Sequence, residues 1–424
     1  MKVVCAPLKG PFGRGADLEV VLFSRADRPM RGAAGANILE VIRKSNLEVA
    51  PRSWDLLSIA LSVIAADTAV RRNKSSDGWT REIDLHIAVD DPTFWSGQRA
   101  LLERQLRFLT TDLWSIEFLD GGVRPPSLPR PTLPREDSVS LLSGGLDSLI
   151  GAIDLIGRER RRPYLVSQVA RGDKEKQSLF ASRIGGGLNH LQLNHDADCP
   201  GEKEISHRAR SIIFIAYGVL LATALRRHHD GQEVPLYVCE NGFIAINPPL
   251  TTARLGSLST RTAHPLFLSL TQTILNKAGL GVRIANPYQA TTKGEMLRNC
   301  ADQALLKANA STTTSCGRFL HFGYKHCGRC VPCLIRRSAF HAWGKPDTTN
   351  YHFVKLARDH EEYARFDDVR SAAMAVMAAR ADGMDRWLGT AVNSASMGDT
   401  SQYREVVERG LGEIGAFLKA VGVK

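Results

Sequence analysis

A Ser-Gly-Gly turn between a strand and a helix limits the fold of this chain more than any other feature of its sequence. Strand-like residues 138–142 precede the turn, and apolar residues 149–156 follow it as the opening of a helix. The turn is Ser143-Gly144-Gly145-Leu146-Asp147-Ser148. Glycines leave no side chains between the backbone N–H groups and an anion, and a helix start carries partial positive charge. Because Asp147 would repel phosphate directly, we expect a pyrophosphate site in which Asp147 holds a bridging Mg²⁺ ion.

Strand and helix signals alternate from residue 138 to about residue 345. Residues 163–169, 234–239 and 281–285 are predicted strands with helical segments between them. This alternation predicts an α/β fold with a doubly wound, mainly parallel sheet. Ligands in such folds bind beyond the carboxyl ends of the strands.

Further segments flank this domain on both sides. Residues 1–120 are predicted to be an α+β module, since residues 81–89 alternate like a half-buried strand. This module contains no catalytic motif, so its expected role is scaffolding or partner docking. Five prolines make residues 121–137 a semi-rigid linker. The region 346–424 is predicted to be helical, and an apolar stripe near its end indicates packing within the chain or against a partner.

Four cysteines with the spacing C-x10-C-x2-C-x2-C predict a metal site. They are Cys316, Cys327, Cys330 and Cys333. Four thiolates without an open position describe a structural Zn²⁺ site, which we favour. An iron–sulfur cluster remains the alternative, because C-x2-C-x2-C also occurs in ferredoxins.

Composition indicates a soluble, cytoplasmic enzyme. The chain has 424 residues, shows no apolar signal-like stretch at its start, and its longest apolar run, 212–225, is short for a membrane span. The net charge of +11 arises from scattered basic residues. We therefore favour general anion binding over nucleic-acid binding, and we expect no membrane partner.

The motif Ser143–Ser148 is identified as the PP-loop of the ATP pyrophosphatases, which cleave ATP between the α and β phosphates and adenylate a substrate oxygen. Together with Ser315-Cys316 and Cys327-Gly328-Arg329-Cys330-Val331-Pro332-Cys333, it resembles the 7-cyano-7-deazaguanine synthase (QueC) family over residues 138–345. Arg210-Ser211 and Thr292-Lys293-Gly294-Glu295 resemble two further family motifs.

Two departures from that family matter. Its Tyr-Pro-Asp-Cys-Arg string is absent, and segments have been added at both ends. In these respects the chain resembles the QueC-like proteins of Qat anti-phage defence systems (QatC). This resemblance implies an ATP-dependent ligase that adenylates a deazaguanine-type carboxylate for attack by an amine, expected to belong to a partner or acceptor protein of a defence operon.

The resemblance also implies roles for individual residues. The PP-loop, including Leu146, would bind ATP, and Arg210 and Lys293 are candidate charge clamps for its phosphates. Glu240 and Asn241 follow a predicted strand and could read the edge of a deazapurine, or Glu240 could bind a second metal. Further substrate-loop candidates are Arg254, Arg261 and His264.

Two other functions stay open. A PP-loop enzyme that thiolates tRNA would need a persulfide-forming cysteine near the nucleotide, and Cys239 is the candidate. A nucleotide-sensing subunit without turnover would use the flanking segments for docking. Formation of AMP distinguishes a ligase from a sensor.

Overall fold

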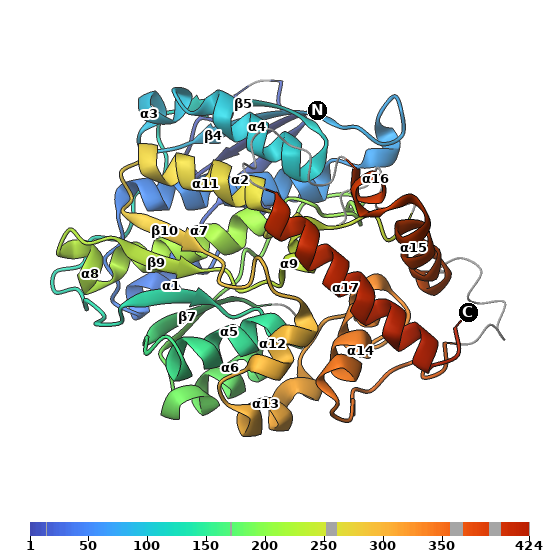
Figure 1. Ribbon diagram of the computed structural model, residues 1–424. Helices are drawn as coiled ribbons and strands as arrows, with labels where there is room; N and C mark the ends of the chain where they lie inside the picture. Colours follow the sequence, from blue (N-terminus) through green and yellow to red (C-terminus); the bar gives the residue numbers. More distant parts are fainter. Residues whose placement is uncertain (14, 170–171, 252–260, 357–367, 390–399, 424) are drawn as a thin grey trace.

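The computed structural model describes residues 1–13, 15–169, 172–251, 261–356, 368–389 and 400–423. Two five-stranded sheets form its framework (Figure 1). The first contains β1 (Lys2–Ala6), β2 (Leu18–Leu22), β3 (Arg31–Ala34), β4 (Glu82–Ala88) and β5 (Leu113–Leu119). The second contains β6 (Ser138–Leu141), β7 (Pro163–Gln168), β8 (His190–Leu193), β9 (Val234–Tyr237) and β10 (Val282–Ala285).

The second sheet confirms the predicted doubly wound domain. Its order is β10-β9-β6-β7-β8, and every neighbouring pair is parallel. Its helices are α5 (Leu146–Gly157), α6 (Lys174–Arg183), α7 (Arg210–Ala224), α8 (Arg226–His229), α9 (Gly242–Ile246) and α11 (Pro265–Lys277). The chain then continues through α12 (Lys293–Asn299), α13 (Gln303–Asn309) and α14 (Val331–Trp343).

The N-terminal module is α/β rather than the expected α+β. All its strand pairs are parallel, in the order β3-β2-β1-β4-β5. Its helices are α1 (Ile38–Lys44), α2 (Pro51–Ala69), α3 (Pro92–Ser96) and α4 (Arg99–Thr110). Helices α1 and α2 connect β3 to β4, whereas α3 and α4 connect β4 to β5, and such crossovers return the chain parallel to its previous strand. The alternation of apolar and polar residues in 81–89 reflects the partial exposure at the start of β4. It carries no information on whether β4 pairs parallel or antiparallel with its neighbours.

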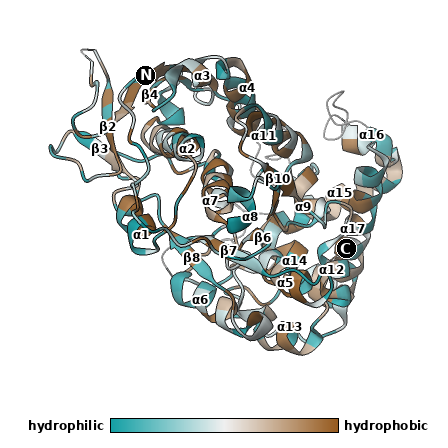
Figure 2. Cartoon of the chain, turned by 90° about the vertical axis from the view of Figure 1, so that its left-hand side faces the viewer, coloured by the Kyte–Doolittle hydropathy of each residue, from teal (hydrophilic) through white to brown (hydrophobic). Residues whose placement is uncertain are grey.

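Helix α2 joins the two sheets. Residues Ser53–Thr68 are buried, and α2 packs against β4 on one side and α7 on the other. Figure 2 shows α2 and α7 lying between the strands of the two sheets. One hydrophobic core consequently includes residues of both, for example Leu85, Leu61, Val219 and Val139. The proline-containing residues 121–137 thus connect two parts that are packed together.

The C-terminal region is helical, as expected. It contains α15 (Asp368–Asp382), α16 (Met384–Leu388) and α17 (Ser401–Ala420). Helix α17 crosses α9, α12 and α14 (Figure 1). The predicted apolar stripe is buried in this contact and consists of Tyr403, Val406, Val407, Leu411, Ile414, Phe417 and Leu418. Within the described ranges, every helix is too short or too polar to cross a bilayer.

Candidate active site

The Ser-Gly-Gly turn lies between β6 and α5 in the geometry that the sequence predicts. Gly144 has φ +82°, a conformation that favours glycine. The Ser143 and Ser148 hydroxyls lie 3.1 Å apart, and Ser148 Oγ also accepts from Ser143 N at 3.2 Å. No side chain caps α5 at Gly145. Its first-turn N–H groups can therefore serve a bound anion.

Asp147 is the centre of a buried polar cluster at the junction of β6 and β9. Lys293 Nζ lies 2.8 Å from Asp147 Oδ1, and both side chains are more than nine-tenths buried. Asn241 donates to Asp147 Oδ2 from Nδ2 at 2.6 Å and from its backbone N at 3.2 Å. Glu240 contacts both Asp147 and Asn241. Four predicted residues thus meet at the point where the strand order of the sheet reverses, where α/β folds bind ligands.

The pKa values of the two carboxyl groups of this cluster shift in opposite directions. Burial raises the pKa of Glu240 well above its ordinary value, and the nearby Asp147 carboxylate raises it further. Burial alone would raise the pKa of Asp147 too, but the Lys293 ammonium and hydrogen bonds from Glu240 and Asn241 hold it below its ordinary value. Of the two, Glu240 therefore holds its proton more strongly and Asp147 ionises more readily. An ionised, buried carboxylate is the form that binds a divalent cation.

Two helix caps place the residues around Asp147. The Asn241 side chain caps α9 by accepting from Ile244 N at 3.0 Å, which leaves its amide nitrogen for Asp147. Thr292 and Glu295 form a capping box at the start of α12, and Lys293 lies between them. Local sequence thus fixes both helix starts.

Two residues that lie beside the PP-loop, Lys176 and Thr314, were not identified from the sequence. Lys176 on α6 contacts Thr314 Oγ1 at 2.5 Å and Asp173 Oδ1 at 3.5 Å. Thr314 N donates to Gly144 O at 3.0 Å, so the segment preceding Cys316 is joined to the PP-loop. The only sequence signal for Lys176 is a basic residue soon after β7, which is too common to single it out.

The four predicted cysteines form one cluster. Their Sγ atoms all lie within 4.8 Å of one another. The Cys316–Cys330 and Cys327–Cys333 sulfur pairs are each 3.9 Å apart, close to the ~3.8 Å edge of a tetrahedron with Zn–S bonds of ~2.3 Å. Backbone N–H groups of Arg318 and Cys327 donate to Cys316 Sγ at 3.3 Å. This cluster could hold a metal ion and suits tetrahedral thiolate ligation.

Comparison with known proteins supports the predicted family. The model for "Queuosine biosynthesis protein QueC" matches residues 263–344. The 7-cyano-7-deazaguanine synthase of Rhizobium leguminosarum bv. trifolii is 34% identical over 241 residues, which cover 50% of this chain and 91% of that protein. This chain belongs to the QueC family. Synthases of Rhizobium rhizogenes (36% over 241 residues, 50% and 91% coverage) and Brucella canis (36% over 188 residues, 41% and 69%) are also similar. No solved structure matches.

The other predicted residues of this QueC-family chain lie in different surroundings. Arg210 is exposed as the first residue of α7, and in the described part of the chain the structure gives it no contact with Asp147. Arg261 donates to Phe108 O at 2.7 Å and lies over the Phe108 ring. His264 caps α11 and also lies against Phe108. Arg254 lies outside the described residues. Binding roles for these four remain predictions.

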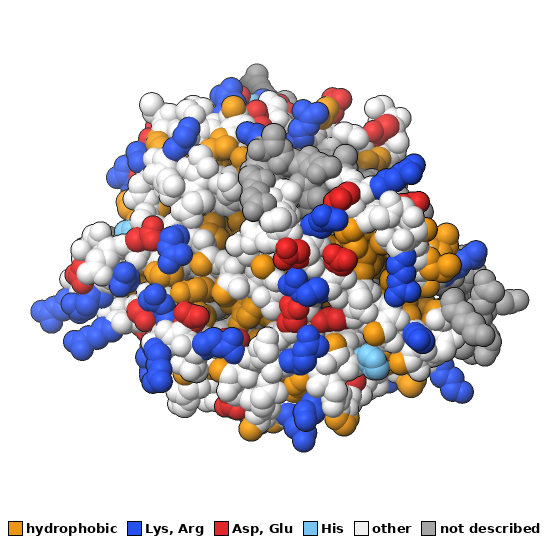
Figure 3. All heavy atoms as spheres, in the orientation of Figure 1, with side chains coloured by type: hydrophobic (Ala, Val, Ile, Leu, Met, Phe, Trp, Pro, Cys, Tyr) orange, Lys and Arg blue, Asp and Glu red, His pale blue; other side chains and the backbone are white. Residues whose placement is uncertain are grey.

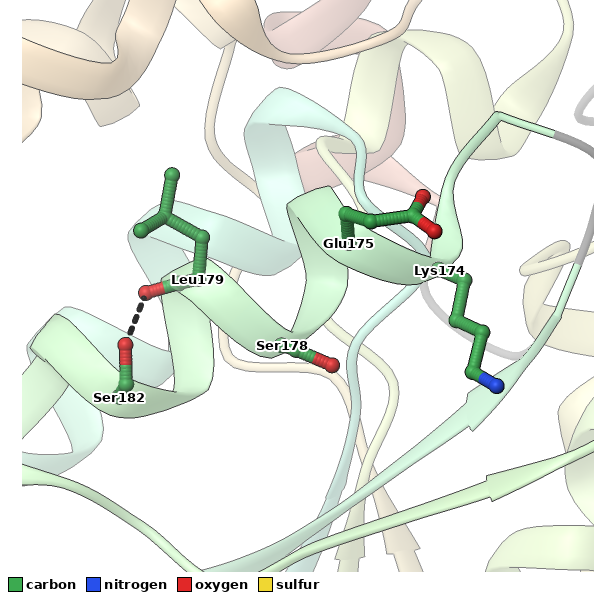
Figure 4. Close-up of a pocket in the computed structure, with 5 residues that line it drawn as sticks. All are labelled: Lys174, Glu175, Ser178, Leu179 and Ser182. Carbon is green, nitrogen blue, oxygen red and sulfur yellow. Dashed lines mark hydrogen bonds between the residues drawn. The ribbon is translucent and has the colours of Figure 1, made fainter.

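Two surface features of this QueC homologue lack the convergent side chains that surround Asp147. Charges of both signs are interspersed over the face seen in Figure 3, without one dominant basic patch. A depression of about 500 Å³ lies on α6 and is lined by Lys174, Glu175, Ser178, Leu179 and Ser182. Figure 4 shows these side chains diverging from a single helix. They do not converge on one point as the residues around Asp147 do, so we assign no site there.

Proposed function

We propose that this chain is an ATP-dependent ligase that adenylates a deazaguanine-type carboxylate and transfers the acyl group to an amine. The arrangement of Asp147, Lys293, Asn241 and Glu240 beside the PP-loop carries this proposal. The names of the similar synthases indicate the substrate class.

Adenylation would begin at the PP-loop. The substrate carboxylate attacks the α phosphorus of ATP, the bond to the bridging oxygen breaks, and pyrophosphate leaves. The amine then attacks the acyl carbon, AMP leaves, and the amine loses a proton to solvent or a base. A carboxylate is a poor electrophile, and AMP supplies the leaving group that it lacks. Bound Mg²⁺ would neutralise charge on the departing pyrophosphate.

This chain's own residues would prepare that step. The N–H groups at the start of α5 and the hydroxyls of Ser143 and Ser148 would bind phosphate oxygens. Asp147 would hold Mg²⁺, and Lys293 would turn its ammonium from Asp147 to the phosphates. The four-cysteine cluster would hold Zn²⁺ as a structural ion, since four thiolates leave no open position.

A cleft of about 260 Å³ is our candidate for the deazaguanine. Residues from α11, β10, the segment after β10 and α17 line it, including Gln272 on α11 and Asn286 and Gln289 after β10. Asn286 Nδ2 also donates to Glu240 O at 2.9 Å, so this cleft adjoins the polar cluster. Amide side chains can pair with the donors and acceptors on the edge of a purine-like ring.

We further propose that the amine belongs to a protein and that the reaction serves anti-phage defence. About half of this chain lies outside the region shared with the Rhizobium synthases, although 91% of their length is covered. These additional parts are available for a partner or acceptor protein. The proposal also rests on the resemblance to the QueC-like proteins of Qat systems.

The structure favours this reaction over tRNA thiolation. Cys239, the candidate persulfide cysteine, is 7% exposed, and burial raises the pKa of its thiol to about 12. A methyl group added at Gly151 would lie 2.3 Å from Cys239 Sγ, so Cys239 is tightly packed against α5. A thiolate nucleophile needs the opposite surroundings.

The test is formation of AMP and pyrophosphate from ATP, Mg²⁺ and 7-carboxy-7-deazaguanine. Asp147→Asn, which keeps the side-chain shape, should abolish the products, while the exposed Glu408→Gln should retain them. AMP that does not depend on the deazaguanine, or binding of ATP without AMP formation, would contradict the proposed ligase. The second result would favour a sensor.

A further inference from the structure

Helix α17 packs against the starts of both helices that supply partners to Asp147. Its Val406 and Gly410 contact α9, which begins directly after Asn241. Its Glu413 contacts the start of α12, whose first residue is Lys293. Figure 1 shows α17 lying across both helices. A segment that lies more than 100 positions from the PP-loop therefore borders the active-site cluster.

Glu413 holds the residues on both sides of Lys293. Its Oε1 accepts from the Thr292 hydroxyl at 2.5 Å, and its Oε2 accepts from Gly294 N at 3.2 Å. Thr292 Oγ1 in turn accepts from Glu295 N at 3.1 Å in the capping box. Lys293 is thus flanked by two hydrogen bonds to one carboxyl group of α17, on a side chain that is 13% exposed.

Glycine makes these approaches possible. A Cβ atom on Gly294 would lie 2.3 Å from Glu413 Oε1, so only glycine admits the carboxyl group at this distance. A Cβ atom on Gly410 of α17 would lie 2.3 Å from Phe243 in α9. Both helix starts are thus in direct contact with α17, without an intervening side chain at these glycines.

We propose that Glu413 is a positioning residue, which fixes the turn Thr292-Lys293-Gly294 so that the Lys293 ammonium reaches Asp147 and the phosphates of ATP. Glu413 acts through Lys293 and touches no substrate. The C-terminal helical region then completes the active site, in addition to any docking role. This inference rests on the proposed function only for the carboxylate substrate; the role of Glu413 at the ATP site does not depend on that substrate.

The test compares Glu413→Ala with Glu408→Ala, which removes an exposed glutamate from the same helix. We measure the affinity for α,β-methylene-ATP with Mg²⁺ by calorimetry, and kcat and KM for AMP formation. Misplacement by about 1 Å can reduce a rate ~100-fold. We expect Glu413→Ala to weaken analogue binding and lower kcat by about 10-fold to 100-fold, and Glu408→Ala to change each less than about two-fold.

A double-mutant cycle separates positioning from general stability. If Glu413 acts through Lys293, then Glu413→Ala should have no further effect on analogue binding in a Lys293→Ala background. Additive losses, or equal behaviour of Glu413→Ala and Glu408→Ala, would overturn the proposal. Should Glu413→Ala fail to fold, Gly294→Ala replaces it in the cycle, because the added methyl group displaces the carboxyl group without deleting it.

The two proposals fail in different ways. If the wild-type protein binds the analogue but makes no AMP with the carboxylate, the proposed ligase is wrong, and the binding cycle alone decides the role of Glu413. If the wild-type protein does not bind the analogue, Lys293 is no phosphate clamp, and both proposals fail.

Discussion

Asp67 should be the most sensitive single link between the two sheets. It is buried on α2, and its Oδ1 accepts from Arg81 Nη2 at 2.6 Å. Its Oδ2 accepts from the backbone N of Arg208 and of Ala209, each at 2.9 Å, directly before α7 begins. One carboxylate of the N-terminal module therefore pairs with a buried arginine and also caps a helix of the PP-loop domain.

The structure sets the expected cost of Asp67→Ala. Removing one partner of a buried ion pair costs about 3–5 kcal/mol, and losing a helix cap costs about 1 kcal/mol. Arg81 keeps a second carboxylate, because Asp112 Oδ2 also lies 2.6 Å from Nη2. The ion-pair loss should thus lie at the lower limit. We expect the free energy of unfolding to fall by about 4 kcal/mol in total.

Urea denaturation measures this loss with two probes. Tryptophan fluorescence reports mainly on the N-terminal module, which contains Trp54, Trp79, Trp95 and Trp114, and thiol reactivity of the four-cysteine cluster reports on the PP-loop domain. Because one core spans both sheets, the two midpoints should coincide and shift together. The control is Asp84→Ala, whose carboxylate is 45% exposed beside His86. A loss below about 1 kcal/mol, or separate midpoints, would refute the reasoning.

Three further predictions concern the site. Burial raises the pKa of Glu240, so the folded protein keeps a proton that the unfolded chain releases near pH 4.5. The stability that this group contributes is therefore lost as pH rises, and Glu240→Gln should flatten the dependence of Tm on pH above 4.5. If the four-cysteine cluster holds a structural ion, chelation should lower Tm and the rate of AMP formation, because four close thiolates lose the ion that they share. An unchanged Tm after verified metal removal would argue against a structural ion. Cys239→Ala should retain AMP formation, measured by chromatography, whereas a thiolation enzyme would lose its activity.

The parts of the site that sequence could predict depend on short-range patterns. The PP-loop, the position of Asn241 after a strand and the motif Thr292–Glu295 each lie within a few residues, where turn and cap chemistry is decisive. The cysteine spacing also sufficed to predict that four thiolates would meet. That Asp147 pairs with Lys293 was not predicted, because the two residues are brought together only by packing of α12 against α5.

Long-range packing explains the predictions that failed or remain open. Arg261 and His264 are predicted substrate-loop residues, and this role stays a prediction. Both contact Phe108 in α4, which no local pattern could indicate. The parallel pairing of the N-terminal strands likewise depends on how crossovers pack, rather than on alternation within β4. No sequence pattern indicated that Glu413 contacts the start of α12, since a glutamate on a helix with an apolar stripe is ordinarily solvent-exposed.

Contacts at helix starts join both additional segments to the PP-loop domain. Asn241 and Lys293, the partners of Asp147, lie at two helix starts, and Glu413 of α17 accepts hydrogen bonds at the second of these. The N-terminal module fixes the start of α7, where Arg210 lies, through Asp67. Each added segment therefore contacts a helix start at the carboxyl edge of the second sheet. If Glu413 positions Lys293 as proposed, any displacement of α17 would shift Lys293 relative to Asp147.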